Sequence, residues 1–518
     1  MLKKMPIGKQ DFEMLRKDGY AYVDKTRLVY QMVDTGGYYF LSRPRRFGKS
    51  LLVSTLKAYF EGKREVFEGL EIAQLEKDWT VRPVMMLDLN TEKYDAPEVL
   101  ENRLDLFISQ QERLYGEDAK EQSLGTRFEG VIRRAAEQTG HRVAILVDEY
   151  DKPMLQAIGK PDLQEAYRNT LKGFYGALKS MDAYIKFAFL TGVTKFGKVS
   201  VFSDLNNLKD ISMDARYYDV CGITQQELLS NFAPEVEALA EANGMTKEEC
   251  VEKLRTEYDG YHFEETSPGI YNPFSVLNTL DRQKFGSYWF ETGTPTYLVT
   301  LLRQHDYSLE QMSKIQVKAE VLNSVDVASS KPNPIPVIYQ SGYLTIKGYD
   351  RRYGRYTLGF PNHEVEEGFV DFLMDHYAGS RQRGTSFDIS YFVDDVEHGR
   401  TEQFVERLRS LFADTPYELV KDLENHYQNV VWLLFKLMGF YVQAEYHTSR
   451  GRIDLVEKTQ DYCYVMEFKL DGTAEEALEQ INSRDYELPF RLENQQIVRI
   501  GMNFDPKTRN VERYLVGY

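Results

Sequence analysis

Three consecutive residues near the N-terminus, Gly48, Lys49 and Ser50, have types and an order suited to phosphate chemistry. They follow the apolar run 38–41 and open a segment with helical spacing. Where a strand passes into a helix, free backbone N–H groups and the helix dipole form an anion site. A lysine there reaches the β- and γ-phosphates, and a serine hydroxyl is a ligand for Mg²⁺. The pattern predicts a P-loop that binds ATP with Mg²⁺.

The loop departs from the usual P-loop pattern at its first position, where Arg43 stands five residues before Gly48. Glycine normally serves there because it tolerates unusual dihedral angles and lets phosphates approach. The loop must therefore turn differently, and Arg45 and Arg46, together with Arg43, can supply additional phosphate contacts. Phe47 completes the predicted nucleotide-binding segment. Taken alone, Gly-Lys-Ser is equally compatible with a chance tripeptide at a helix start.

A second motif makes the nucleotide site the favoured interpretation. The five apolar residues 143–147 lead into Asp148 and Glu149, and a buried parallel strand delivers such carboxylates to the sheet edge where the first loop lies. We expect Ser50 to ligate Mg²⁺, Asp148 to hold the ion through water, and Glu149 to orient or deprotonate the attacking water. A solvated acidic turn is the alternative. Thr191, after a later apolar run, is a weaker candidate for contacting the γ-phosphate.

Another set of charged residues lies near the C-terminus, around a predicted turn at residues 458–461. In a hairpin Asp454 falls beside Met466 or Glu467, whereas Glu467 and Lys469 are two apart and share one face. Two carboxylates that hold Mg²⁺ or Mn²⁺ beside a lysine can activate water against a phosphodiester. The alternative is an ordinary cross-strand salt bridge, although the apolar strand around Glu467 makes an unpaired charge costly.

Two predicted helices bring further side chains to this second cluster. The helix over residues 474–486 places Gln480 and Tyr486 within reach of the same face, and the helix over residues 423–437 begins with Glu424, a possible metal ligand. The sequence therefore proposes the catalytic residues Asp454, Glu467, Lys469 and Gln480, and the metal ligands Asp454, Glu467 and Glu424.

The order of apolar runs predicts how these residues are positioned. Up to about residue 223, strand-like runs alternate with amphipathic helices, which indicates an α/β fold with a parallel sheet and helices on both faces. The predicted strands are residues 38–41, 84–89, 143–147 and 185–190.

The rest of the chain separates into two further parts. Short helices dominate after residue 224, and the segments 342–346 and 356–360 flank the turn-like residues 349–354, which predicts a hairpin of winged-helix type. A helical run and a strand-rich stretch then predict a C-terminal α/β domain. We expect an N-terminal domain at 1–223, a helical and winged-helix-like region at 224–385 and a C-terminal domain at 386–518.

Composition restricts the cellular setting and the partners. The chain has 518 residues, 42% of them hydrophobic and 28% charged, the profile of a soluble globular protein. No apolar run approaches the ~18 residues of a membrane span, and the N-terminus lacks the pattern of a signal peptide. The separated Cys221, Cys250 and Cys463 argue against disulfides and structural zinc, which favours a cytoplasmic protein.

The net charge of −16 disfavours tight, non-specific nucleic-acid binding, although Arg351 and Arg352 can act locally.

The N-terminal part resembles the bacterial AAA-ATPase-like proteins that carry a C-terminal nuclease-like domain. The arginine-for-glycine P-loop is itself the form that this family shows. The C-terminal part is similar to the PD-(D/E)XK nuclease superfamily, through Asp454, Glu467, Lys469, Gln480, Tyr486 and Glu424. The blocks that carry the first resemblance are residues 22–26, 43–50, 148–153, 205–208 and 271–275.

The resemblance implies an ATP-operated switch or motor coupled to a metal-dependent phosphodiesterase acting on DNA or RNA, and the chain is a possible homo-oligomer. A rival interpretation is a nucleotide-gated interaction protein whose C-terminal domain binds a partner without cutting, which the acidic balance favours. A third is an ATPase motor with a degenerate nuclease module. All three share the nucleotide site.

Overall fold

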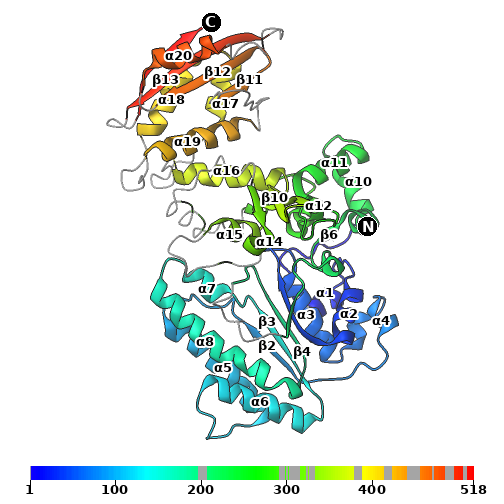
Figure 1. Cartoon of the computed structure of the whole chain (residues 1–518). Helices are drawn as coiled ribbons and strands as arrows, with labels where there is room; N and C mark the ends of the chain where they lie inside the picture. The colour runs from blue at the N-terminus through cyan, green and yellow to red at the C-terminus, as the bar shows by residue number, and fades with distance from the viewer. Residues whose placement is uncertain are drawn as a thin grey trace. The chain divides into compact units, whose positions relative to one another are not determined.

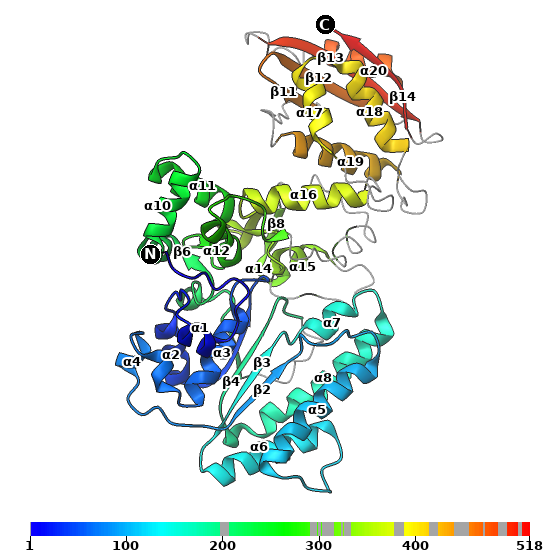
Figure 2. The same ribbon diagram turned by 180° about the vertical axis from the view of Figure 1, so that it is seen from behind.

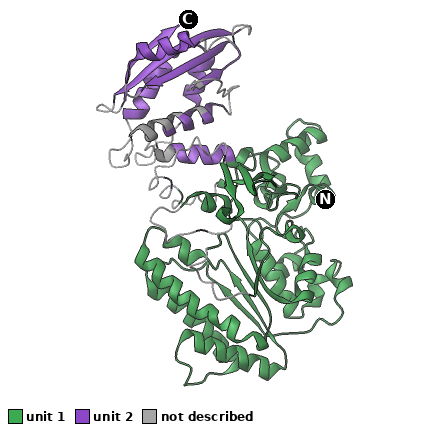
Figure 3. Cartoon of the chain, in the orientation of Figure 1, with its two compact units in different colours: residues 1–298, 314–365 green, residues 299–313, 366–518 purple. Residues whose placement is uncertain are grey.

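The structure, a computed structural model, is divided into two compact units (Figure 3). Unit 1 comprises residues 1–298 and 314–365, and unit 2 comprises residues 299–313 and 366–518. This division is coarser than the three predicted domains, whose boundaries stay a prediction. The described residues are 2–196, 207–290, 298, 302, 315–322, 325, 333–377, 388–413, 423–439, 455–469, 472–484, 490, 495–505 and 510–518.

Unit 1 is built on a five-stranded parallel sheet with the order β2-β3-β4-β1-β5 (Figure 1). The four predicted strands are β1 to β4, so the predicted parallel sheet is confirmed. The strands read as continuous apolar runs because both faces of the sheet are covered, and every residue of β3 is buried. The strands are β1 (Gly37–Ser42), β2 (Val84–Asp88), β3 (Val143–Asp148), β4 (Ile185–Gly192) and β5 (Leu208–Asp210).

Helices cover both faces of this sheet, as the two opposite views show (Figures 1 and 2). On one face α3 packs against β2, β3 and β4 and is itself covered by α1. On the other face α5, α6 and α8 form a layer, in which the rings of Phe128 and Phe174 stack at 4.5 Å. The helices are α1 (Phe12–Lys17), α2 (Thr26–Thr35), α3 (Lys49–Phe60), α4 (Ile72–Leu75), α5 (Pro97–Tyr115), α6 (Leu124–Thr139), α7 (Lys152–Gln156) and α8 (Pro161–Ser180).

A helical part follows the sheet in sequence and confirms the short helices predicted after residue 224. Its core is formed by buried apolar side chains such as Leu228, Val236, Leu254 and Val276. The strands β6 and β7 pair antiparallel beside it. The elements are β6 (Ile223–Thr224), α9 (Gln225–Asn231), α10 (Ala233–Ala242), α11 (Lys247–Tyr258), β7 (Ile270–Tyr271) and α12 (Pro273–Arg282).

The predicted hairpin is present as β9 and β10 in an antiparallel sheet with the order β8-β10-β9. Among the residues described between β8 and β9, α14 and α15 are helical, and this order of elements is similar to that of a winged helix. The first strand begins at Thr345, three residues later than predicted, because Gly342 closes α15 with φ +90°. The elements are β8 (Ile315–Lys318), α14 (Ala319–Leu322), α15 (Ile335–Gln340), β9 (Thr345–Asp350), β10 (Arg355–Gly359) and α16 (His363–Tyr377).

Unit 2 contains a mixed four-stranded sheet with the order β11-β12-β13-β14, which confirms the predicted C-terminal α/β domain. The strands β12 and β13 are parallel and are connected through α20, which packs on the sheet. On the opposite face the hydroxyl of Tyr464 donates to the carbonyl of Val396 in α17, at 2.9 Å. The elements are α17 (Ser390–Glu397), α18 (Thr401–Ala413), α19 (Leu423–Met438), β11 (Leu455–Lys458), β12 (Tyr462–Lys469), α20 (Ala474–Ser483), β13 (Gln496–Asp505) and β14 (Asn510–Gly517).

Among the helices that the structure describes, none has the length and apolarity needed to cross a membrane.

Candidate functional site

The predicted phosphate loop and Asp148 meet at one edge of the parallel sheet. Because β4 lies between β1 and β3, the loop after β1 and the end of β3 are one strand apart. Lys49 Nζ lies 3.6 Å from Glu149 Oε1, and a side-chain hydrogen bond joins Ser50 to Asp148. The structure therefore brings together the four residues that the spacing selected.

The start of α3 has no hydrogen bond from a capping side chain. Gly48 is the N-cap residue in the left-handed region, at φ +95° and ψ 18°, and no side chain caps the helix. A Cβ at this position would meet nothing within 4 Å, so the requirement for glycine is conformational. Uncapped N–H groups and the helix dipole favour an anion at this point.

The side chain of Lys49 is held inside its own loop. Its ammonium donates to the carbonyls of Arg43 and Pro44, at 3.2 and 3.3 Å, and the residue is only 4% exposed. Neutral carbonyls are weaker partners for an ammonium than phosphate oxygens are. The lysine is thus placed to exchange these carbonyls for a phosphate without leaving the loop.

The carboxyl of Asp148 is buried among charged groups of both signs. Burial is the main reason why its pKa rises to about 6. The hydrogen bond from Ser50 and the charge of Lys49 lower the pKa, and the charges of Glu149 and Asp88 raise it. Asp88 pairs in register with Asp148 at the end of β2, and the sequence interpretation did not select it. Asp88 lies inside the predicted strand 84–89, and only its register with Asp148 marks it as part of the site.

The Ser50 hydroxyl and the Asp148 carboxylate fit a Mg²⁺ ion. Both are hard oxygen donors, and Mg²⁺ keeps several waters and substrate oxygens, so two protein ligands are sufficient. Within the described ranges there is no group of three or more His, Cys, Asp or Glu side chains that could hold a metal ion. A Mg²⁺ ion at this point would be held by Ser50, Asp148, water and oxygens of the substrate.

Glu149 is held in a strained backbone conformation. Its φ of +52° lies in the left-handed region, which costs a non-glycine residue on the order of 1–3 kcal/mol. Its own N–H donates to Asp148 Oδ1 at 3.0 Å, and the next N–H, of Tyr150, donates to the carbonyl of Thr191 at 3.1 Å. These bonds keep the Glu149 side chain beside Lys49.

Asp151 is a buried residue of this turn to which the sequence interpretation gave no role. Its Oδ2 accepts hydrogen bonds from the N–H of Val193, at 3.1 Å, and from the N–H and hydroxyl of Thr194, at 2.6 and 2.7 Å. Burial raises the pKa of Asp151. A Cβ on Gly192 would lie 2.1 Å from its Oδ1. Asp151 thereby fixes the loop after β4 against the turn that carries Glu149.

Thr191 lies at the end of β4, as predicted, but its hydroxyl already has a structural partner. It is fully buried and donates to the carbonyl of Leu41 at 2.7 Å, which ties β4 to β1 beside the loop. Its contact with a γ-phosphate stays a prediction.

Of the three arginines in the loop, Arg43 is buried and bonded to the protein, whereas Arg45 and Arg46 are exposed. Arg43 is buried and donates to the carbonyls of Ser212 and Tyr217, at 2.7 and 3.2 Å, and burial lowers its pKa to about 10. Its guanidinium is therefore occupied by the protein rather than offered to phosphate. Arg45 and Arg46 are exposed.

Phe47 and an apolar cavity lie beside the loop. The Phe47 ring packs edge-on against Tyr261 at 4.8 Å between centroids. An open cavity is bounded by Phe47, Gly48, Val23, Pro273 and other residues. Its walls are mostly apolar, and it adjoins the start of α3.

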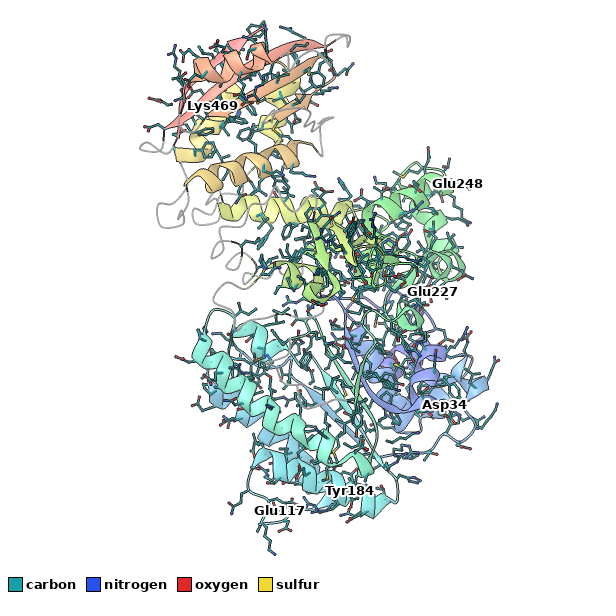
Figure 4. All side chains as sticks on the ribbon, viewed as in Figure 1. Asp34, Glu117, Tyr184, Glu227, Glu248 and Lys469 are labelled. Carbon is teal, nitrogen blue, oxygen red and sulfur yellow. The ribbon has the colours of Figure 1, made fainter. Side chains whose placement is uncertain are left out.

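The second predicted cluster is assembled in unit 2, where Figure 4 labels Lys469. Lys469 Nζ lies 3.1 Å from Glu467 Oε1 and 2.7 Å from Gln480 Oε1. The amide of Gln480 also donates to Glu467. Glu467 is only 2% exposed. The predicted shared face and the reach of Gln480 are thus observed, and the helix that carries Gln480 ends at Ser483.

Three further residues were predicted for this cluster. Asp454 and Tyr486 lie outside the described residues. Glu424 is the second residue of α19, but its side chain is not among those described. The described register ends with Leu455 opposite Met466.

Two sequence profiles match the chain. One, described as "Predicted AAA-ATPase", covers residues 6–202, and the other, described as "PD-(D/E)XK nuclease superfamily", covers residues 422–514. A protein of Azotobacter chroococcum mcd 1, "Uncharacterized protein in vnfD 5'region", is 34% identical over an aligned length of 531 residues that covers 99% of each chain. The chain belongs to the AAA-ATPase-like family with a C-terminal PD-(D/E)XK domain.

Among solved structures, that of the Aeropyrum pernix ORC2 protein (ADPNP-ADP complexes) is similar at 12% identity. The match covers 68% of this chain and 89% of that chain, with a TM-score of 0.17. A score this low supports no inference about the AAA-ATPase-like protein.

In this AAA-ATPase-like protein, the buried carboxyl group of Glu364 is linked to the phosphate loop through Trp289. The indole N–H of Trp289 donates to the carbonyl of Arg45 at 3.2 Å. The backbone N–H of Trp289 donates to Glu364 Oε1 at 2.8 Å, and the hydroxyl of Ser275 donates to Glu364 Oε2 at 2.7 Å. Burial raises the pKa of Glu364 to about 7 from 4.5.

Glu364→Gln is expected to remove a pH dependence of stability. Between pH 4.5 and about 7 the folded chain keeps a proton on Glu364 that the unfolded chain loses. Stability from this group therefore falls as the pH rises, by at most about 3 kcal/mol. Because glutamine imitates the protonated form, the variant should melt at a higher temperature than wild type at pH 8 and equally at pH 5.

Thermal unfolding followed by circular dichroism at both pH values measures this difference. The exposed Glu241→Gln, in α10, is the matched control and should melt like wild type. An identical pH dependence in wild type and Glu364→Gln would contradict the assignment.

Proposed function

We propose that this protein binds and hydrolyses ATP with Mg²⁺ in unit 1 and cuts nucleic acid with Mg²⁺ or Mn²⁺ in unit 2. The meeting of Lys49, Ser50, Asp148 and Glu149 at one sheet edge carries the proposal. A homo-oligomeric state and a cytoplasmic location belong to the same proposal.

In the nucleotide site each part has a separate task. The N–H groups at the start of α3 and the Lys49 ammonium bind the phosphates, and the exposed Arg45 and Arg46 add positive charge. The apolar cavity beside Gly48 takes the base. Ser50 and Asp148 hold Mg²⁺, which neutralises phosphate charge when bound. Glu149 orients the attacking water or accepts its proton.

In the nuclease-like site the proposal assigns roles to the residues of the second cluster. Glu467, Asp454 and Glu424 hold the metal ion, which polarises the phosphodiester when bound. Lys469 stabilises developing negative charge or positions the attacking water. Gln480 bonds to both Glu467 and Lys469 and so fixes their orientation. An ordinary surface salt bridge would need no such third partner.

A cleavage screen tests the nuclease half. Labelled single- and double-stranded DNA and RNA are incubated with the protein and Mg²⁺, Mn²⁺ or EDTA, with and without ATP. We expect cleavage of at least one substrate with metal and none with EDTA. The complete absence of metal-dependent cleavage would contradict this half.

One observation favours the rival, a nucleotide-gated interaction protein that does not cut. The net charge of −16 opposes broad nucleic-acid binding. The rival predicts that ATP changes the oligomeric state or the capture of a protein partner, and that Asp454→Ala leaves this response intact. Sedimentation with and without ATP separates the two functions.

A further inference from the structure

The tip of the β9–β10 hairpin concentrates positive charge on an acidic protein. Residues 345–359 contain Lys347, Arg351, Arg352 and Arg355, with Asp350 as the single acid. The three arginines are exposed. Over the ranges of unit 1 that the structure describes, their guanidiniums form no ion pair. The charge is therefore presented to solvent and is not used in folding the hairpin.

The single acid of the tip is occupied by the backbone. Asp350 Oδ1 accepts hydrogen bonds from the N–H groups of Arg352 and Tyr353, at 2.9 and 3.2 Å, which fixes the turn. The Arg352 guanidinium lies over the Tyr353 ring, 5.3 Å from its centroid, and Tyr353 is 60% exposed. The tip is thus an ordered projection that carries oriented cations.

A like-charge pair extends this surface across the sheet. The register places Lys318 of β8 directly opposite Arg355 of β10, and both side chains are exposed. Like charges directly opposite one another destabilise a sheet. A bound polyanion would remove the repulsion between the two cations. The fold itself does not require two like charges at these positions.

The helix before the hairpin, α15, is buried. In α15, Ile335, Val337 and Ile338 are buried. Gln340 Oε1 accepts from the N–H of Lys195 at 2.7 Å, and its amide donates to the carbonyl of Leu322 at 2.6 Å. A buried helix cannot enter a groove to read base edges, which leaves the exposed tip as the part of this region that can contact a polyanion. Contacts to phosphates carry no sequence information.

We infer that Arg351, Arg352, Arg355 and Lys318 form a binding surface for the phosphate backbone of duplex DNA. This rests on the proposed function in taking nucleic acid as the substrate. A two-stranded ribbon enters the major groove of B-form DNA, whereas the corresponding groove of duplex RNA is too narrow. The Tyr353 ring already lies under Arg352, which disfavours stacking on unpaired bases.

Fluorescence anisotropy with a labelled DNA duplex of random sequence, in EDTA, tests the surface without cleavage. The variant Arg351→Gln/Arg352→Gln/Arg355→Gln should bind at least about tenfold more weakly than wild type at physiological salt. Its log–log salt slope should be smaller by about 2 to 3, because three phosphate contacts are lost. The matched control Arg113→Gln/Lys120→Gln/Lys179→Gln removes three exposed charges elsewhere and should bind within about twofold of wild type.

The outcomes separate this inference from the proposed function. Equal DNA binding by the tip variant and the control, or equal wild-type affinity for an RNA duplex of the same sequence, overturns the inference alone. Failure of wild type to bind any nucleic acid overturns both. Tip-dependent binding without metal-dependent cleavage supports the inference and contradicts only the nuclease half.

Discussion

Glu149→Gln is expected to lower the rate of ATP hydrolysis at least about 100-fold, because a positioned general base contributes on the order of 10² to 10⁴ in rate. The Glu149 backbone is held in a left-handed conformation by its neighbours, and its carboxylate lies 3.6 Å from the Lys49 ammonium. Glutamine keeps the size of the side chain and loses the basic oxygen. ATP affinity should therefore change by less than about threefold.

Phosphate release and the binding of a fluorescent ATP analogue measure the two quantities on one preparation. Glu117→Gln, an exposed glutamate labelled in Figure 4, removes the same charge away from the site and should hydrolyse ATP like wild type. An unchanged rate of ATP hydrolysis in Glu149→Gln would contradict the role of Glu149 as the base that activates water.

Lys469→Ala is expected to abolish metal-dependent cleavage, with a loss of about 10² to 10³ in rate, typical for removing one charge-stabilising donor. The variant deletes the ammonium that bonds to both Glu467 and Gln480. ATP hydrolysis should persist, since the nucleotide-site residues lie in unit 1. Lys469→Gln keeps a polar side chain that is one atom shorter and uncharged, and should lose cleavage as well.

The matched control for this prediction is Lys436→Ala. Lys436 forms a lysine–carboxylate pair with Glu366 in the same unit, at 2.8 Å, so its loss tests whether any such salt bridge matters. Cleavage should be retained in the control. Equal effects of the two substitutions on cleavage would reduce the Glu467–Lys469 pair to an ordinary surface salt bridge.

The sheet and its phosphate edge were predictable because parallel strands leave a strong pattern. Fully buried strands read as apolar runs, and the ends of parallel strands meet at one edge, so Lys49 and Asp148 could be placed together from spacing alone. Asp88 and Asp151 could not be selected in this way. The role of Asp88 depends on its register with Asp148, and that of Asp151 depends on the path of the loop after β4.

The contribution of Arg43 shows why side-chain roles escape a sequence interpretation. An arginine in a phosphate loop suggests a phosphate contact, yet its partners are carbonyls of residues 169 and 174 positions away in sequence. Trp289 is a similar case, because its bond to the Arg45 carbonyl spans 244 positions. No local pattern encodes such contacts.

In unit 2, local periodicity was enough for part of the site. Residues two apart on a strand share a face, so the Glu467–Lys469 pair followed from spacing. The contact of Gln480 with both required the helix α20 to pack across β12, which the order of elements suggested. The exact partner of Asp454 depended on hairpin register, which a turn position fixes only to within one residue.

The central claim is that the start of α3, Lys49 and Asp148 form one polyphosphate site. Isothermal titration calorimetry of wild type and Lys49→Ala with ATP and Mg²⁺ tests it most directly, with Lys57→Ala, a lysine of the same helix with 45% side-chain exposure, as the control. We predict binding by wild type and Lys57→Ala, and a loss of at least about 100-fold in Lys49→Ala, since removing a buried charged partner costs about 2–5 kcal/mol. No ATP binding by wild type, or equal binding by Lys49→Ala, would contradict the account.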